Sequence, residues 1–133
     1  MEAGQLYAGV SEIEFKPELG LMTGDGAPVA RGYLTPLYVK ALVLANGHAE
    51  CAVVTLDLIG MDRPDTAQAA QLASQRCGIP ADSILMTCSH THVAPSSMPS
   101  GTAYQEAFNP RYSEEAKARE RAFVDKIVLT IAD

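Results

Sequence analysis

A nearly uninterrupted apolar run at residues 51–59 constrains the fold more than any other part of the chain. The run reads Cys-Ala-Val-Val-Thr-Leu-Asp-Leu-Ile. Its length and its β-branched residues indicate a strand, and continuous apolar character is typical of a strand that is covered on both faces. We therefore predict a covered strand in the middle of its sheet.

The residues after this run predict a strand, helix, strand unit. Asp62 and Asp65 mark a helix start, the Ala- and Gln-rich segment 66–76 continues the helix, and Gly78 ends it. Residues 83–88 then form a short strand. A helix of ordinary length between two strands favours parallel pairing through a right-handed crossover.

Two more strands are predicted before this unit. Residues 7–15 alternate between apolar and polar side chains, as in a strand with one wet face. Residues 37–45 form another apolar run, and the Asn46-Gly47 pair between it and residues 51–59 is a strong hairpin signal.

The remaining segments are expected to be long loops and one final helix. Residues 18–36 and 93–110 are rich in Gly, Pro and Ser, and Ser113 is a suitable cap for a helix with an apolar stripe. We expect one α/β domain over residues 1–133, with α+β as the alternative fold class. Its mixed sheet should have about four to five strands, with two main helices.

Composition excludes several classes of partner. The net charge is −6 and the basic residues are dispersed, which argues against nucleic acid. No run approaches the ~20 apolar residues of a transmembrane segment, and the first residues lack a signal-peptide pattern, so we expect a cytoplasmic protein. The three cysteines form no CxxC pair and predict no disulfide framework.

The segment Ser89-His90-Thr91-His92 carries the clearest chemistry, directly after the predicted strand 83–88. Ligands of open α/β sheets bind beyond the carboxyl ends of strands, and neutral imidazole is a good zinc ligand. Side chains one residue apart on an extended segment point to opposite sides. His90 and His92 are thus expected to serve one ligand each unless the backbone leaves the strand conformation. Spacing alone also fits a polar loop whose histidines bond to backbone.

Five segments occur in an order that suggests a family. They are Ala-Gly-Val-Ser-Glu-Ile at 8–13, Gly-Leu-Met-Thr-Gly-Asp-Gly at 20–26, Pro-Leu-Tyr-Val-Lys-Ala-Leu-Val-Leu at 36–44, Val-Thr-Leu-Asp-Leu-Ile-Gly at 54–60, and Thr-Cys-Ser-His-Thr-His-Val-Ala-Pro at 87–95. In this order they resemble the N-terminal part of the catalytic domain of neutral, non-lysosomal ceramidases. The last segment is similar to the signature Ser-x-Thr-His-Thr-His-Ser-x-Pro of that family.

The resemblance implies a zinc-dependent hydrolase that cleaves the N-acyl amide of ceramide into a fatty acid and a sphingoid base. By position in the motif, His90 would be a zinc ligand and His92 a hydrogen-bond donor to the oxyanion. The chain would then be part of a larger ceramidase-like domain. Val93 departs from the family pattern, which has serine after the second histidine, and Ser89 stands where threonine is common.

The resemblance also implies an incomplete site. The other zinc ligands of the family, a histidine, a glutamate and a tyrosine, and its serine nucleophile follow further downstream, and His48 does not match the missing histidine. We therefore expect this chain alone to be truncated and inactive, with weak or absent zinc binding. Family members are often secreted or associated with membranes, in contrast to the cytoplasmic expectation above.

The roles of the neighbouring residues stay open at this point. Asp57 either orients a ligand histidine or caps the turn after its strand, and Ser89 is a candidate for supporting the zinc ligand. Cys88 is expected to be a buried small residue rather than a nucleophile. Ser96 and Ser97 are expected to be simple loop residues.

Two functional interpretations follow. In the first, the chain is an incomplete zinc amidohydrolase that acts on a ceramide-like lipid amide. In the second, it is a non-catalytic binding module derived from that fold, which associates with itself. A sheet left without its parent domain exposes an edge or a face, so we expect a homo-oligomer.

Overall fold

The computed structural model describes residues 4–21, 23, 29–95, 97 and 114–133. These residues form a mixed four-stranded sheet and two main helices, which confirms the predicted α/β class. The elements in chain order are β1 (Tyr7–Phe15), β2 (Leu37–Ala45), β3 (Glu50–Leu56), α1 (Arg63–Cys77), the 3₁₀ turn η1 (Ala81–Ser83), β4 (Ile84–Cys88) and α3 (Glu114–Ala132).

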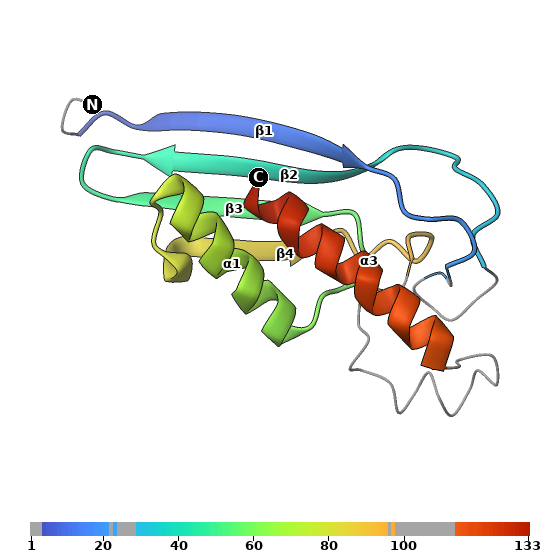
Figure 1. Cartoon of the computed structure of the whole chain (residues 1–133). Helices are drawn as coiled ribbons and strands as arrows, with labels where there is room; N and C mark the ends of the chain where they lie inside the picture. The colour runs from blue at the N-terminus through green and yellow to red at the C-terminus, as the bar shows by residue number, and fades with distance from the viewer. Residues whose placement is uncertain (1–3, 22, 24–28, 96, 98–113) are drawn as a thin grey trace.

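The strands lie in the order β1-β2-β3-β4. The first two pairings are antiparallel, whereas β3 and β4 are parallel and are joined through α1. The predicted hairpin between β2 and β3 is confirmed, and Gly47 takes a positive φ of 82° in its turn. Figure 1 shows α1 and α3 side by side on one face of the sheet. The described part of the chain is therefore a two-layer structure.

The hydrophobic core lies between the sheet and these helices. Leu56 and Leu58 are completely buried beside Val124 and Ile127 of α3. The ring of Phe15 at the end of β1 lies 6.2 Å, centroid to centroid, from the ring of Phe123. The core thus joins α3 to the part of the sheet where β1 and β3 end.

The expectation that β3 is covered on both faces is wrong. Its side chains alternate between buried residues, such as Val54 and Leu56, and less buried ones, such as Val53 and Thr55. Both helices lie on the same side, so every second side chain of β3 points away from them. The expectation of a central position is correct, because β3 lies between β2 and β4.

The predicted limits of α1 are confirmed. Asp62 precedes the helix with an extended backbone, and Pro64 occupies its first turn, where a missing N–H costs no helical bond. Gly78 ends the helix with a φ of 82°, and its N–H donates to the carbonyl oxygen of Ser74 at 2.9 Å. The predicted cap at Ser113 lies outside the described residues.

An ion pair joins the two helices. Asp65 in the first turn of α1 is only 4% exposed, and its Oδ2 accepts a hydrogen bond of 3.1 Å from Nη1 of Arg121 on α3. Arg121 Nη2 lies 2.8 Å from the other carboxylate oxygen, and Arg121 Nε donates to Asp125. The hydrogen bond with Asp65 raises the pKa of Arg121 further above its ordinary value, so the guanidinium stays charged.

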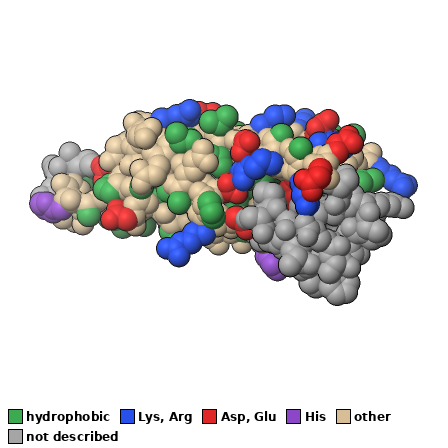
Figure 2. Space-filling view, turned by 60° about the horizontal axis from the view of Figure 1, so that its bottom comes forward, with side chains coloured by type: hydrophobic (Ala, Val, Ile, Leu, Met, Phe, Trp, Pro, Cys, Tyr) green, Lys and Arg blue, Asp and Glu red, His purple; other side chains and the backbone are tan. Residues whose placement is uncertain are grey.

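Figure 2 shows a face on which acidic and basic side chains are mixed. Among the described helices, none has the length and apolar character needed to cross a membrane.

We predict that Asp65→Asn lowers the free energy of unfolding by about 1 kcal/mol, because it weakens a largely buried, charge-assisted bond between the helices. Urea denaturation measures the loss. Asp125→Asn is the matched control, because its side chain is 61% exposed; we expect a change within about 0.5 kcal/mol. Equal losses in the two variants would contradict the assigned role of Asp65.

Candidate metal site at the carboxyl end of the sheet

The backbone leaves the strand conformation directly after β4. The strand ends at Cys88, and His90 has a φ of 61°, a positive value that no other non-glycine residue takes in the described part of the chain. This left-handed conformation costs a residue with a Cβ roughly 1–2 kcal/mol. Such strain is concentrated at functional sites, where the surrounding contacts hold it in place.

This backbone turn brings the two predicted histidines together. The ring centroids of His90 and His92 lie 5.0 Å apart, and the rings meet edge to face at 88°. Both residues are exposed. One ligand each was expected unless the backbone leaves the strand conformation, and at His90 the backbone does leave it. The turn therefore places the two imidazoles in contact with each other.

A backbone carbonyl fixes the orientation of His90. Its Nδ1 lies 2.6 Å from the carbonyl oxygen of Ile59, in the segment that follows β3. A carbonyl oxygen can only accept, so Nδ1 carries the proton and the lone pair of Nε2 remains available. Histidines that bind metals are commonly oriented in this way, by a hydrogen bond from their other ring nitrogen.

Other bonds connect the same two segments. The N–H of Ser89 donates to the carbonyl oxygen of Leu56 at 2.9 Å, and Oγ of Ser97 donates to the carbonyl oxygen of Gly60 at 2.5 Å. Ser97 is completely buried, so it does more than the simple loop residue that we expected. The segments after β3 and β4 are thus attached to each other at several points. Ser96 lies outside the described residues.

Asp57 supports the sheet rather than a histidine. Its Oδ2 accepts a hydrogen bond of 2.9 Å from the N–H of Tyr38, and its own N–H donates to the Tyr38 carbonyl oxygen at 3.0 Å. Neither of the two roles left open by the sequence matches this geometry, because Tyr38 belongs to β2 and not to the turn after β3. The group that orients His90 is instead the backbone carbonyl of Ile59. It could not be predicted from the sequence, because every residue type carries a backbone carbonyl.

The other two neighbours add no reactive group. Ser89 contributes its backbone N–H to the strand pairing, and its side chain is exposed. Burial raises the pKa of the Cys88 thiol. A thiol with a raised pKa carries less of the nucleophilic thiolate, in agreement with the expected role of a small buried residue.

An apolar hollow lies at the same edge of the sheet. Its volume is about 550 Å³, and its walls come from the end of β1, the loop at 29–37, and Val93 and Pro95, which follow the histidines. An isolated β-bridge between Thr23 and Pro95 connects the walls. The lining is largely apolar, and two of its side chains are highly exposed: Leu34 at 99% and Val93 at 78%.

The described residues do not make up a complete zinc site. No group of three or more His, Cys, Asp and Glu side chains that could hold a metal occurs among them. Zinc takes three or four protein ligands, and the turn after β4 offers two imidazoles. A complete site would need further ligands from elsewhere.

We predict that at position 90 a Gly variant is more stable than an Ala variant, which is the reverse of the usual order. Ala and Gly both remove the imidazole, but only Gly takes a φ of 61° without strain. His90→Gly should therefore unfold at a higher urea concentration than His90→Ala, with a difference of about 0.5–1 kcal/mol. At His92, which has no positive φ, the Ala variant should be the more stable one. The same order at both positions would contradict the backbone conformation of His90.

We also predict that Cys88 reacts more slowly with iodoacetamide at pH 8 than Cys51 and Cys77 in dilute protein. Cys88 is half-buried with a raised pKa, whereas the other two are exposed. Mass spectrometry of the digested protein follows each cysteine over time. Fastest labelling at Cys88 would indicate an activated thiolate and overturn its assignment as an inert residue.

Comparison of the sequence with protein-family models and with curated proteins finds no match. The resemblance to neutral ceramidases rests on the five segments alone and stays a prediction.

Proposed function

We propose that the chain supplies part of the active site of a zinc-dependent amidohydrolase that cleaves the N-acyl amide of a ceramide-like lipid. The observation that carries the proposal is the conformation of His90. The bond from Nδ1 to the Ile59 carbonyl fits a polar loop as well, so the support comes from the left-handed backbone together with the neighbouring imidazole.

In this proposal the two histidines have different roles. Nε2 of His90 would hold the metal, and the bond to the Ile59 carbonyl favours the tautomer that leaves this nitrogen unprotonated. Bound zinc would supply a Lewis acid that polarises the amide carbonyl. His92, whose ring lies 5.0 Å from that of His90, donates a hydrogen bond to the oxygen on which negative charge develops. The apolar hollow beside Val93 seats an acyl chain.

The proposal requires metal ligands beyond His90. In this proposal they come from another polypeptide. We therefore propose that this chain alone is an incomplete form, which binds zinc weakly and does not hydrolyse ceramide.

Calorimetric titration with zinc tests this proposal. We expect weak binding, with a dissociation constant above the micromolar range, that is lost in His90→Ala. His48→Ala is the matched control, because His48 is an exposed histidine in the β2–β3 turn; this variant should bind as the parent protein does. Absence of any binding at millimolar zinc, or an equal effect of the two substitutions, would refute a role for His90 as a ligand.

A stronger result would change the proposal in a defined way. Sub-micromolar affinity would mean that the chain completes the site, with ligands from a second copy or from residues outside the described part. Zinc-dependent release of fatty acid from a ceramide, lost in His92→Ala, would then show an active enzyme and contradict the proposed incomplete form.

A second candidate function is a non-catalytic binding module that associates with itself. The specific observation in its favour is the uncovered face of the sheet, where Val10 is 83% exposed and Leu85 is 62% exposed. This function requires no metal, so failure of the zinc titration would leave it standing.

A further inference from the structure

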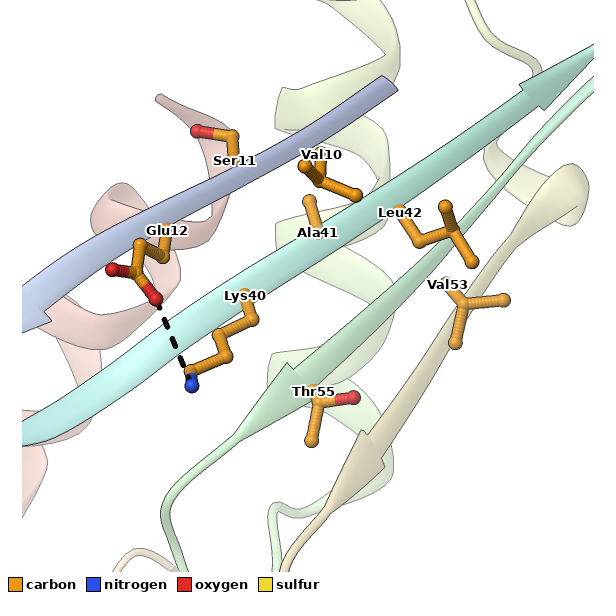
Figure 3. A pocket seen from close by; sticks show the side chains of 8 residues that line it. All are labelled: Val10, Ser11, Glu12, Lys40, Ala41, Leu42, Val53 and Thr55. Atoms are coloured by element: carbon orange, nitrogen blue, oxygen red, sulfur yellow. Dashed lines mark ion pairs between the residues drawn. The ribbon is translucent and has the colours of Figure 1, made fainter. Parts of the chain in front are cut away.

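The face of the sheet opposite the helices carries an organised set of apolar side chains. Figure 3 shows several of them around a shallow hollow of about 560 Å³ that extends over β1, β2 and β3. Antiparallel sheets commonly have a solvated face, but the outward side chains of such a face are usually polar. Here only part of the face follows that rule.

The strand register divides this face into rows that run across the strands. One row is entirely apolar and spans all four strands, and the row next to it toward the β2–β3 turn is apolar as well. In the first row, Val10 pairs with Leu42, Leu42 with Val53, and Val53 with Leu85. The second row consists of Ala8, Leu44 and Cys51.

The row on the other side, toward the histidines, is polar. It consists of Glu12, Lys40, Thr55 and Thr87, again in register across the sheet. Nζ of Lys40 lies 3.6 Å from Oε2 of Glu12, and this ion pair is the dashed line in Figure 3. The open face therefore has an apolar half near the β2–β3 turn and a polar half near the candidate metal site.

We propose that this face is covered by the same face of a second copy of the chain, with the apolar half as the main contact. Sheets that pack face to face keep their strand directions within about 30° of each other. A twofold axis parallel to the strands, between β2 and β3, places each row against itself in reversed strand order. Val10 then faces Leu85 of the other copy, and Leu42 faces Val53, so apolar rows meet apolar rows.

The twofold axis along the strands also keeps charges of the same sign apart. It places β1 over β4 and β2 over β3, so Glu12 faces Thr87 of the other copy and Lys40 faces Thr55. Neither charge meets a charge of its own sign, and the ion pair within each copy is preserved. A twofold axis across the strands and through the row of Val10, by contrast, would bring the row of Ala8 and Leu44 against the polar row, and an axis nearer the β2–β3 turn would overlap only the apolar half. The distribution of side chains therefore favours the axis along the strands.

The size of the face sets the expected strength of the dimer. Four strands about 4.8 Å apart and some seven residues long cover on the order of 450 Å² per copy. A stable interface typically buries about 800 Å² on each partner. We therefore infer a weak, reversible dimer that forms in the micromolar range or above. This inference rests on the second candidate function and does not depend on zinc.

Sedimentation equilibrium of the intact chain over the micromolar range tests the dimer. We expect a monomer–dimer equilibrium that Leu85→Lys weakens at least about tenfold, because it places a charge in the apolar row. Leu129→Lys is the matched control, since Leu129 is a 52% exposed leucine on α3, away from this face; it should leave the dimer unchanged. Circular dichroism verifies that each variant is folded. A parent protein that stays monomeric throughout, or a dimer weakened only by Leu129→Lys, would overturn the proposal.

The native cysteines provide a test without substitution. Cys51 lies in the second apolar row, whereas Cys77 lies at the end of α1 on the other side of the sheet. Alkylation of Cys51 should slow as the protein concentration rises, while that of Cys77 should stay constant. Rates that are independent of concentration at both cysteines would contradict burial of this face in a dimer.

A mixing experiment tests the arrangement of the two copies. Val10→Glu and Leu85→Lys should each weaken self-association, but an equimolar mixture should associate more tightly than either variant alone. The reason is that residue 10 of one copy faces residue 85 of the other in the proposed dimer. Failure of the mixture to recover association would overturn the axis along the strands.

Discussion

The parallel pairing of β3 with β4 is the constraint on which the candidate site depends. Parallel strands carry their carboxyl ends to the same edge of a sheet. The segments that follow Leu56 and Cys88 are therefore neighbours, although α1 separates them in the sequence. Their contacts, from the Ile59 carbonyl to His90 and from Ser97 to Gly60, are possible only because of this placement. The crossover through α1 thus positions the imidazole pair.

The sequence was a good guide where local chemistry decides the structure. The limits of α1 followed from Asp62 and Gly78, and the β2–β3 hairpin followed from Asn46-Gly47. It was a poor guide to the covering of β3. Val53 has the same apolar side chain whether it faces a helix or solvent, and the run itself carries no information on which layers surround it.

For the candidate site, too, the sequence predicted the residue types but not their arrangement. The residue types at 90 and 92 suggested metal chemistry, and their position after a strand suggested the edge of the sheet. The relative orientation of the two rings depends on one backbone torsion and one carbonyl oxygen, and neither is encoded in a residue type. Asp57 was the obvious candidate for an orienting group because it is a carboxylate, but its bond to Tyr38 closes the end of the β2–β3 pairing instead.

The left-handed conformation at His90 also narrows which side chains can occupy this position. Asn, Asp and Gly tolerate a φ near 61°, whereas branched residues such as Val and Ile do so poorly. A related protein that keeps this turn without the imidazole would therefore be expected to carry one of the first three residues here. The residue type at this position in such a protein would therefore indicate whether the left-handed turn is kept when the imidazole is lost.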